Sequence, residues 1–174
     1  DYNTSATSFN NTFYGCTGLT DIPVGLFNNT SVSTFNNTFT NCTSLTGISS
    51  VFQNLATVTS FNGTFSGCTS LVSSGISANT FSGCSNVTDF SNTFYGCNNI
   101  TTMPSGIFNY SSGVTLFAGT FQKCTQLSAI PSGLFDYGYN VTSFANIFSG
   151  TSISVIPNGL FNNTTKVLSF TGTF

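Results

Sequence analysis

Apolar residues recur along this chain at fixed intervals, and these intervals define a repeat. Residues 58–68, VTSFNGTFSGC, hold two phenylalanines four positions apart, followed by a glycine and a cysteine. Similar segments start at residues 6, 32, 87, 114, 141 and 167, and each except the last leads into a second apolar segment, best preserved at residues 19–29 and 127–137. A fixed period is the sequence signature of a repeat architecture, so the pattern predicts a stack of similar units.

All 20 phenylalanines belong to this repeat and fall into three columns. The first column is Phe9, Phe35, Phe61, Phe90, Phe117, Phe144 and Phe170, and the second, four residues later, is Phe13, Phe39, Phe65, Phe94, Phe121, Phe148 and Phe174. The third, at the end of the second segment, is Phe27, Phe52, Phe81, Phe108, Phe135 and Phe161. Burial of one such ring contributes about 1.5–3 kcal/mol, so we expect the columns to form a phenylalanine core.

The repeat divides the chain into coils of 26 to 29 residues, a length typical of leucine-rich solenoids. We expect a single repeat array over residues 1–174, with partial coils at both ends and coils at residues 6–31, 32–57, 58–86, 87–113, 114–140 and 141–166. Neither end carries the atypical capping repeat that usually shields a solenoid. This feature predicts that the array is part of a longer chain.

Two short segments of each coil have strand character, VTSF at its start and LTxI before the proline. Ile-Pro followed by glycine predicts a turn, and the spacing of the paired phenylalanines suits a single helical turn. The expected fold is therefore a β-rich solenoid of parallel coils about 4.7–4.9 Å apart. Two coils depart from the pattern. Residues 73–86 carry an insertion, for which we expect a bulge, and residues 148–157 align best with the cysteine deleted, for which we expect a tighter turn.

The repeated phrase VTxFxxxFxGCxxLT resembles the repeat of BspA-like leucine-rich proteins. It is especially similar to the bacterial surface-protein variety, in which methionines often occupy the places held here by phenylalanine. The resemblance covers essentially the whole chain. It implies a leucine-rich-repeat solenoid that is secreted or lies on a cell surface, in a family associated with adhesion and with host or matrix contact.

Charged residues are almost absent. The chain has two lysines, Lys123 and Lys166, four aspartates, and no histidine, glutamate, arginine or tryptophan. Nucleic-acid binding depends on cationic side chains that displace counterions, so we expect no nucleic-acid partner. Polar residues interrupt every apolar run, so we expect no membrane insertion of this segment. Without histidine or clustered acidic residues, we also expect no catalytic residues, no cofactor, no metal site and no enzymatic activity.

Five cysteines form a column, and a sixth lies outside it: Cys16, Cys42, Cys68, Cys97 and Cys124, with Cys84 in the insertion. Two interpretations compete for the column. Leucine-rich repeats usually hold Asn or Cys at this position, buried and hydrogen-bonded to the turn backbone, which predicts free thiols. In an oxidising setting, adjacent coils would instead bring the Cα atoms to distances compatible with disulfides. We favour buried thiols in the column, with Cys84 as the possible disulfide former.

N-glycosylation sequons are about twice as frequent as the composition predicts. One group falls in the loop after the third phenylalanine of a coil, where we expect a stripe of glycans: Asn3, Asn28, Asn29, Asn86, Asn109, Asn140, Asn162 and Asn163. A second row lies between the paired phenylalanines: Asn10, Asn36 and Asn62. Asn41 and Asn99 complete the set. Such a coat would help to keep a nearly uncharged chain in solution.

These features predict an extracellular, glycosylated structural protein that builds a surface stalk or filament by self-association or continuation end to end. The alternative is a cell-surface adhesin or receptor ectodomain that binds a protein or glycan through the solenoid face, with residues 73–86 as the candidate surface. The tyrosines in the turns are open to two interpretations, a sugar-binding surface or aromatics that cover the coil edge: Tyr14, Tyr95, Tyr110, Tyr137 and Tyr139.

Overall fold

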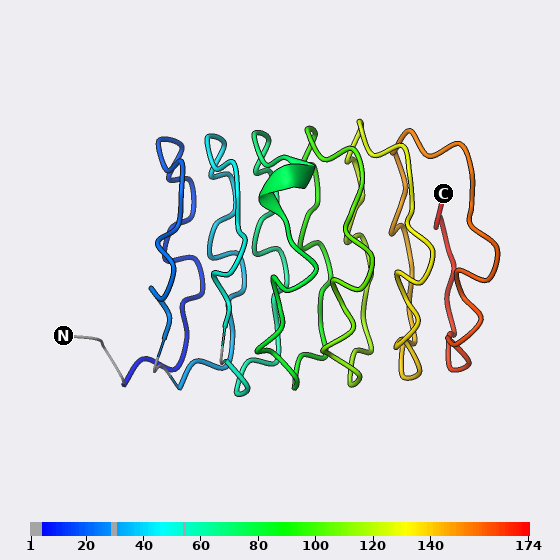
Figure 1. The fold of residues 1–174 in the computed structure, drawn as a ribbon, viewed down its shortest axis with the longest axis horizontal. Helices are drawn as coiled ribbons and strands as arrows, with labels where there is room; N and C mark the ends of the chain where they lie inside the picture. Colours follow the sequence, from blue (N-terminus) through cyan, green and yellow to red (C-terminus); the bar gives the residue numbers. More distant parts are fainter. Residues whose placement is uncertain (1–4, 29–30, 54) are drawn as a thin grey trace.

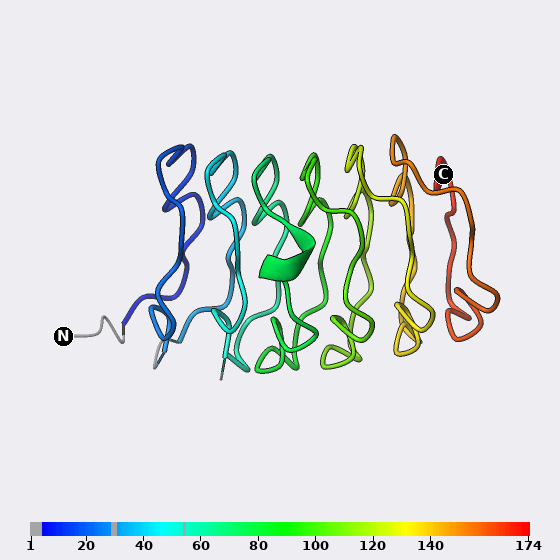
Figure 2. The same cartoon turned by 45° about the horizontal axis from the view of Figure 1, so that its top comes forward.

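The computed structural model describes residues 5–28, 31–53 and 55–174. The chain winds into successive coils that stack along one axis, so that the described N-terminal and C-terminal coils lie at opposite ends of the stack (Figure 1). Figure 2 shows the same row of coils from a second direction. Within the described residues, the one regular element is the 3₁₀-helix η1, Ser73–Gly75.

Isolated parallel β-bridges join successive coils. One column of bridges passes through the third residue of each coil: Ser8, Thr34, Ser60, Asp89, Leu116, Ser143 and Ser169. The second strand-like segment forms a bridge between Thr102 and Ala129. The expected parallel arrangement is therefore confirmed. The expectation of a β-rich chain is wrong for the described residues, because the bridges do not extend into strands.

The segment between the paired phenylalanines is not the helical turn that the spacing suits, and that expectation is wrong. Two residues after the first phenylalanine, φ is positive (54–64°) in seven coils: Asn11, Asn37, Gly63, Asn92, Gly119, Asn146 and Gly172. Two residues after the second, φ is positive again (60–75°): Gly15, Asn41, Gly67, Gly96, Lys123 and Gly150. A left-handed residue ends a right-handed turn, and Gly and Asn adopt this conformation at the lowest cost. The Asn and Gly columns of the repeat follow from this requirement.

The left-handed residues direct alternate backbone N–H groups toward the next coil. In the third coil, four N–H groups donate to the fourth: Phe61 to Asp89 O at 3.0 Å, Gly63 to Ser91 O at 2.9 Å, Phe65 to Thr93 O at 2.9 Å and Gly67 to Tyr95 O at 2.7 Å. The N–H groups between them close turns within the coil: Thr64 to Phe61 O at 3.1 Å, Ser66 to Gly63 O at 3.0 Å and Cys68 to Phe65 O at 3.1 Å. The backbone of this segment is thus satisfied without a helix or a strand.

Phenylalanine rings fill the interior together with Leu, Ile, Val and Cys side chains, and 15 of the 20 rings are buried. Rings of the first column stack with centroid separations of 5.5–5.8 Å. Third-column rings lie edge-on or tilted against them at 4.7–5.1 Å. Both arrangements are favourable for aromatic pairs. The core prediction is confirmed for these 15, whereas the outermost coils hold the partly buried or exposed ones: Phe9, Phe13, Phe161, Phe170 and Phe174.

A column of buried threonines lies beside the first phenylalanine column and was not expected from the sequence. Its fully buried members are Thr38, Thr64, Thr93 and Thr120. The Thr64 hydroxyl lies 2.7 Å from Phe61 O in its own coil and 2.8 Å from Phe35 O in the preceding coil. The hydroxyls therefore link neighbouring coils inside the core. In the sixth coil, buried Ile147 takes this place.

The two irregular coils differ from the expectations. In place of a simple bulge, the insertion forms η1, whose Gly75 carbonyl accepts hydrogen bonds from Ile48 N at 2.7 Å and Ser49 Oγ at 3.1 Å. In the sixth coil, Thr151 occupies the cysteine position, because its N–H donates to Phe148 O at 3.2 Å and its hydroxyl lies 2.7 Å from the same oxygen. The repeat position that this coil lacks therefore comes after Thr151, and the expectation that the cysteine is the deleted residue is wrong.

Candidate functional site

The most distinctive surface follows the third phenylalanine in the fourth to sixth coils. We call residues 109–113, 136–140 and 162–166 the loop edge. Three tyrosines on it are about half exposed, Tyr110 at 44%, Tyr137 at 45% and Tyr139 at 48%. Short turns position them: Ser111 N donates to Phe108 O at 3.1 Å, and Gly138 N donates to Phe135 O at 2.9 Å. The turns bury the phenylalanines and direct the tyrosines outward.

Contacts between coils connect the loop edge into one surface. The Tyr110 hydroxyl donates to Asn79 Oδ1 at 2.8 Å, which joins the fourth coil to the insertion of the third. The rings of Tyr137 and Tyr139 meet edge to face with their centroids 6.4 Å apart. Two further bonds reach the sixth coil: Asn163 Nδ2 to Asp136 O at 2.9 Å and Lys166 Nζ to Asn140 Oδ1 at 2.7 Å.

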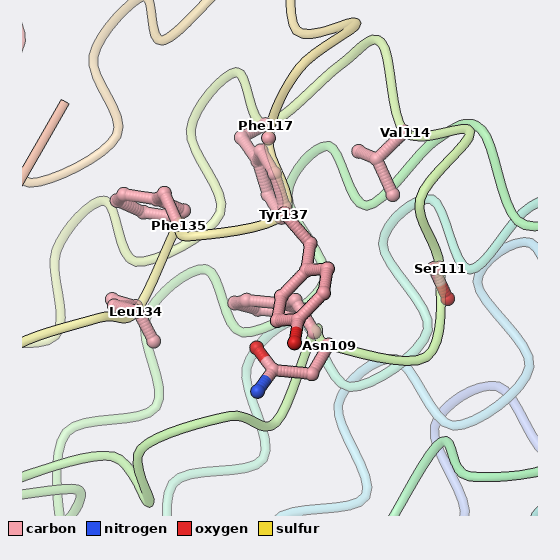
Figure 3. Close-up of a pocket in the computed structure, with 9 residues that line it drawn as sticks. Asn109, Ser111, Val114, Phe117, Leu134, Phe135 and Tyr137 are labelled. Atoms are coloured by element: carbon pink, nitrogen blue, oxygen red, sulfur yellow. The ribbon is translucent and has the colours of Figure 1, made fainter. Parts of the chain in front are cut away.

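A small cavity lies beneath this surface, between the fourth and fifth coils. Its volume is about 10 Å³, which is room for one water molecule at most. Its walls are mainly apolar, and Asn109 and Tyr137 belong to its polar part. Figure 3 shows the Tyr137 ring beside the Asn109 amide, with Phe117 and Val114, both buried, farther from that amide. The cavity is too small for a ligand, so the exposed rim is the part available for recognition.

A larger open hollow of about 230 Å³ lies at the first coil. Its walls are almost entirely apolar: Phe13, Leu19, Ile22, Pro23, Leu26 and Phe39, with the one carboxyl-bearing side chain Asp21. It offers no group that would act as a base or nucleophile beside that carboxyl.

Several predicted sequon asparagines have structural contacts. Three residues of the predicted stripe donate an amide N–H to a backbone carbonyl of the preceding coil: Asn86 to Ala56 O at 2.8 Å, Asn140 to Ser112 O at 3.1 Å and Asn163 to Asp136 O at 2.9 Å. Of the others, Asn109 and Asn162 are exposed, and Asn28 is half-buried. Asn3 and Asn29 lie outside the described residues. Glycosylation at all of these positions stays a prediction.

The second sequon row forms a ladder of its own. Asn10 Oδ1 accepts the Asn36 N–H at 2.8 Å, Asn36 Oδ1 accepts the Ser60 hydroxyl at 2.6 Å, and Asn62 Nδ2 donates to Asp89 Oδ2 at 3.1 Å. The threonines that complete the Asn36 and Asn62 sequons belong to the buried threonine column. The fold therefore supplies a reason for the N-x-T spacing in this row that is independent of glycans.

The cysteine column confirms the expected burial and turn hydrogen bonds in four coils. The Sγ atoms lie 3.0–3.1 Å from a phenylalanine carbonyl of the preceding coil: Cys42, Cys68, Cys97 and Cys124. All six thiols are free, and Cys16, in the first coil, is exposed. Burial raises the pKa of Cys42 to about 11, assisted by the neighbouring Cys16, and raises the pKa of Cys124 to about 12. Thiols held in this way are protonated and unreactive near neutral pH.

Cys84 is also a free, buried thiol, and its Sγ lies 3.6 Å from Phe52 O. Burial raises its pKa to about 12. A buried and protonated sulfur has little access to a second cysteine, so the geometry favours the thiol. The disulfide that its place in the insertion suggested stays an untested prediction.

The acidic groups are scattered over the described residues. Asp89 caps its own turn through the Ser91 N–H at 2.7 Å, whereas Asp21 and Asp136 are exposed on separate coils. Over residues 5–28, 31–53 and 55–174 there is no group of three or more His, Cys, Asp or Glu side chains suited to a metal ion. The same part of the chain has no helix with the length and apolar character needed to cross a membrane.

Comparison with solved structures gives leucine-rich-repeat proteins. A leucine rich cell surface protein from Faecalibacterium prausnitzii A2-165 is 21% identical over 71% of this chain and 35% of its own, with a TM-score of 0.43. A leucine-rich repeat protein from Bacteroides ovatus ATCC 8483 is 20% identical over 86% and 46%, with a TM-score of 0.33. The matched chain of a TLR13–ssRNA13 complex is 16% identical over 86% of this chain and 26% of its own, with a TM-score of 0.48. The chain thus spans less than half of each of these proteins.

No curated protein matches the chain. A family model, described as "Mycoplasma protein of unknown function, DUF285", matches residues 1–79 and 59–174, which together cover the whole chain. The repeat of this family is of the BspA type, so the resemblance seen in the sequence is confirmed. The chain belongs to the DUF285 family of repeat proteins.

Proposed function

We propose that the chain is an extracellular or cell-surface repeat protein whose coils build a stalk or filament. The observation that supports this proposal is the uniform bonding between coils. The same backbone N–H groups of the paired-phenylalanine segment donate to the next coil in the first, third and fifth coils alike, as at Phe13, Phe65 and Phe121. An array in which each unit contacts only its neighbours gains length without a new kind of contact.

The bonding has a direction, which supports self-association or continuation end to end. The N–H groups of the paired-phenylalanine segment donate to the next coil. The residues just before the first phenylalanine donate to the preceding coil, as Thr59 N does to Ser33 O at 2.8 Å. The two faces of a coil therefore differ and complement each other. Heterologous contacts of this kind propagate without closing.

Glycosylation is the second part of the proposal. Within the stripe, Asn109 and Asn162 are exposed residues and Asn28 is half-buried, so we take these three as the acceptors to test. Peptide mapping of the native protein by mass spectrometry tests this part. We expect glycans at these three positions, and finding all three bare would contradict the glycan stripe.

The stalk or filament is tested by electron microscopy of the native, full-length material. We expect long fibres with a regular axial repeat, because every coil presents the same pair of complementary faces and bonds to its neighbours in the same direction. Discrete short rods at every protein concentration examined would contradict the proposal, whatever the outcome of the glycan mapping.

A cell-surface adhesin or receptor ectodomain is the second candidate. It is favoured by the loop edge, where three half-exposed tyrosines from two coils depart from the regular repeat. A filament needs no such surface. Loss of binding to a defined ligand on substitution of these tyrosines, with the array intact, would favour this candidate. Neither candidate includes a nucleic-acid partner, because two lysines cannot displace many counterions from phosphates.

A further inference from the structure

We propose that the loop edge binds a neutral oligosaccharide, with Tyr110, Tyr137 and Tyr139 as the stacking platform. This proposal goes beyond the stalk or filament and does not depend on it. It rests on three features of the loop edge: exposed aromatic faces, adjacent amide groups, and a local charge that sums to zero.

The aromatic faces are the first feature. Tyrosine presents a flat apolar body and a polar tip, and the C–H face of a pyranose ring has the complementary shape and polarity. Tyr137 and Tyr139 meet at 78°, so their rings offer two differently oriented surfaces 6.4 Å apart between centroids. Tyr110 stands on the neighbouring coil. Together the three rings can contact more than one sugar residue of a short chain.

The polar surroundings are the second feature. The amides of Asn79 and Asn109 lie beside Tyr110 and Tyr137, respectively, and the Asn79 amide oxygen is held by the Tyr110 hydroxyl at 2.8 Å. The Asn163 amide donates to Asp136 O, next to Tyr137 in the sequence, at 2.9 Å. Amides present both donors and acceptors, which matches sugar hydroxyls. Because the Asn79 and Asn163 amides are tied to neighbouring coils, binding requires little ordering of these side chains, and preorganisation of this kind increases affinity.

The charge is the third feature. The loop edge carries one anion, Asp136, and one cation, Lys166, whose ammonium is held by Asn140 Oδ1 at 2.7 Å. The local charge therefore sums to zero, and the edge offers no cluster of cations for sulfate, phosphate or carboxylate groups. These features favour neutral hexose or N-acetylhexosamine chains over anionic glycans.

The chain reports binding directly, because it has six tyrosines and no tryptophan. A glycan on Asn109 or Asn140 would cover the platform, so the proposal applies to chains that carry none at these two positions, and the protein is prepared without N-glycans. Cellotetraose, chitotetraose and mannotetraose are titrated while the tyrosine fluorescence is followed. We expect at least one of them to bind with a saturable change in fluorescence.

Two variants test whether binding depends on the tyrosines of the loop edge or on any exposed tyrosine of the chain. Tyr137→Ala should weaken binding about tenfold, the size of effect typical of an aromatic that anchors an interface. Tyr14→Ala is the matched control, because Tyr14 is 55% exposed but follows the second phenylalanine of the first coil. It should bind as the unmodified chain does, and circular dichroism verifies that both variants are folded.

Three results would overturn the proposal. They are no binding of any of the three tetrasaccharides, equal losses in Tyr137→Ala and Tyr14→Ala, and tighter binding of a heparin tetrasaccharide than of every neutral one. Tyr139→Ala provides a second test of the same platform if Tyr137→Ala fails to fold. None of these results bears on fibre formation, which is measured separately.

Discussion

Replacing Gly63 with alanine tests the local backbone account most sharply. Gly63 has φ of +64°, and its N–H donates to Ser91 O in the next coil at 2.9 Å. A Cβ at this position would overlap Asn37 Oδ1 of the preceding coil and lie 3.3 Å from Asn37 Cγ. The substitution therefore adds two separate costs, one conformational and one steric.

The size of each cost follows from the geometry. A left-handed conformation costs an L-residue about 1–2 kcal/mol. Overpacking a close contact costs about 1–3 kcal/mol more, less if the Asn37 amide swings aside. We therefore expect Gly63→Ala to lower the free energy of unfolding by about 2–5 kcal/mol. In a helical turn, by contrast, the change from glycine to alanine would raise stability by about 1 kcal/mol, so even the sign distinguishes the two backbones.

Gly96→Ala is the matched control. Gly96 has φ of +68°, and nothing lies within 4 Å of a Cβ built on it. This variant should lose only the conformational term of about 1–2 kcal/mol. Adding Asn37→Gly to Gly63→Ala should recover the steric term and bring the cost close to that of Gly96→Ala. Urea unfolding followed by circular dichroism supplies the four values of the double-mutant cycle.

Two outcomes would refute this reasoning. If Gly63→Ala and Gly96→Ala cost the same and Asn37→Gly changes nothing, the contact between neighbouring coils at this position does not exist. If Gly63→Ala stabilises the protein, the residue is not left-handed.

Three further predictions concern other columns of the repeat. Gly75→Ala should cost about 1–3 kcal/mol in urea unfolding, because its Cβ would overlap the Thr46 carbonyl oxygen, which is backbone, whereas Gly18→Ala, with open space around the Cβ, should be nearly neutral. Thr93→Val should cost about 1–2 kcal/mol, because it deletes a buried hydroxyl that lies 2.7 and 3.0 Å from two carbonyl oxygens; no loss would show that the hydroxyl is dispensable. Burial raises the pKa of Cys124 from 9.0 to about 12 in the folded chain. The thiol's contribution to the free energy of unfolding is therefore complete below about pH 9. It declines as the pH rises toward 12, by up to about 1.4 kcal/mol per pH unit, because the unfolded chain then loses the proton first. Cys124→Thr should flatten that decline in urea unfolding at alkaline pH, and an unchanged slope would contradict the assignment.

The three phenylalanine columns could be predicted because every phenylalanine of the sequence falls at one of three fixed positions in the repeat. What the spacing could not decide was the backbone between the paired rings, since the two phenylalanines stand four positions apart in a helical turn and equally in the left-handed arrangement. A signal for the correct choice was present. The position two residues after the first phenylalanine is always Asn or Gly, as at Asn37 and Gly63, and these two residue types tolerate positive φ best.

The buried threonines were missed for a different reason. Their sequence context, as at Asn62-Gly63-Thr64, matches a glycosylation sequon, which is typical of a surface motif and not of a buried position. Its burial depends on contacts with Phe35 O of the preceding coil, 29 residues away. Contacts between coils of this kind also place Tyr110 against Asn79, and no spacing in one coil predicts them.

Lys123 is the one member of the left-handed columns that is neither Asn nor Gly. Its φ is +60°, and its ammonium lies 5.4 Å from the centroid of the Tyr95 ring in the preceding coil. The contact with Tyr95 raises the pKa of Lys123. A cation over an aromatic face offsets part of the conformational cost at an exposed site. The sequence alone did not reveal this pairing, because the two residues are 28 positions apart.

The central claim is that alternate N–H groups of the paired-phenylalanine segment bond to the next coil. Scalar couplings across hydrogen bonds, measured by long-range HNCO NMR on the labelled chain, test it most directly. The account predicts couplings from Gly63 N to the Ser91 carbonyl carbon and from Phe65 N to the Thr93 carbonyl carbon, across bonds of 2.9 Å each. Coupling from Phe65 N to the carbonyl carbon of Phe61, four residues earlier, would instead establish a helical turn and contradict the account.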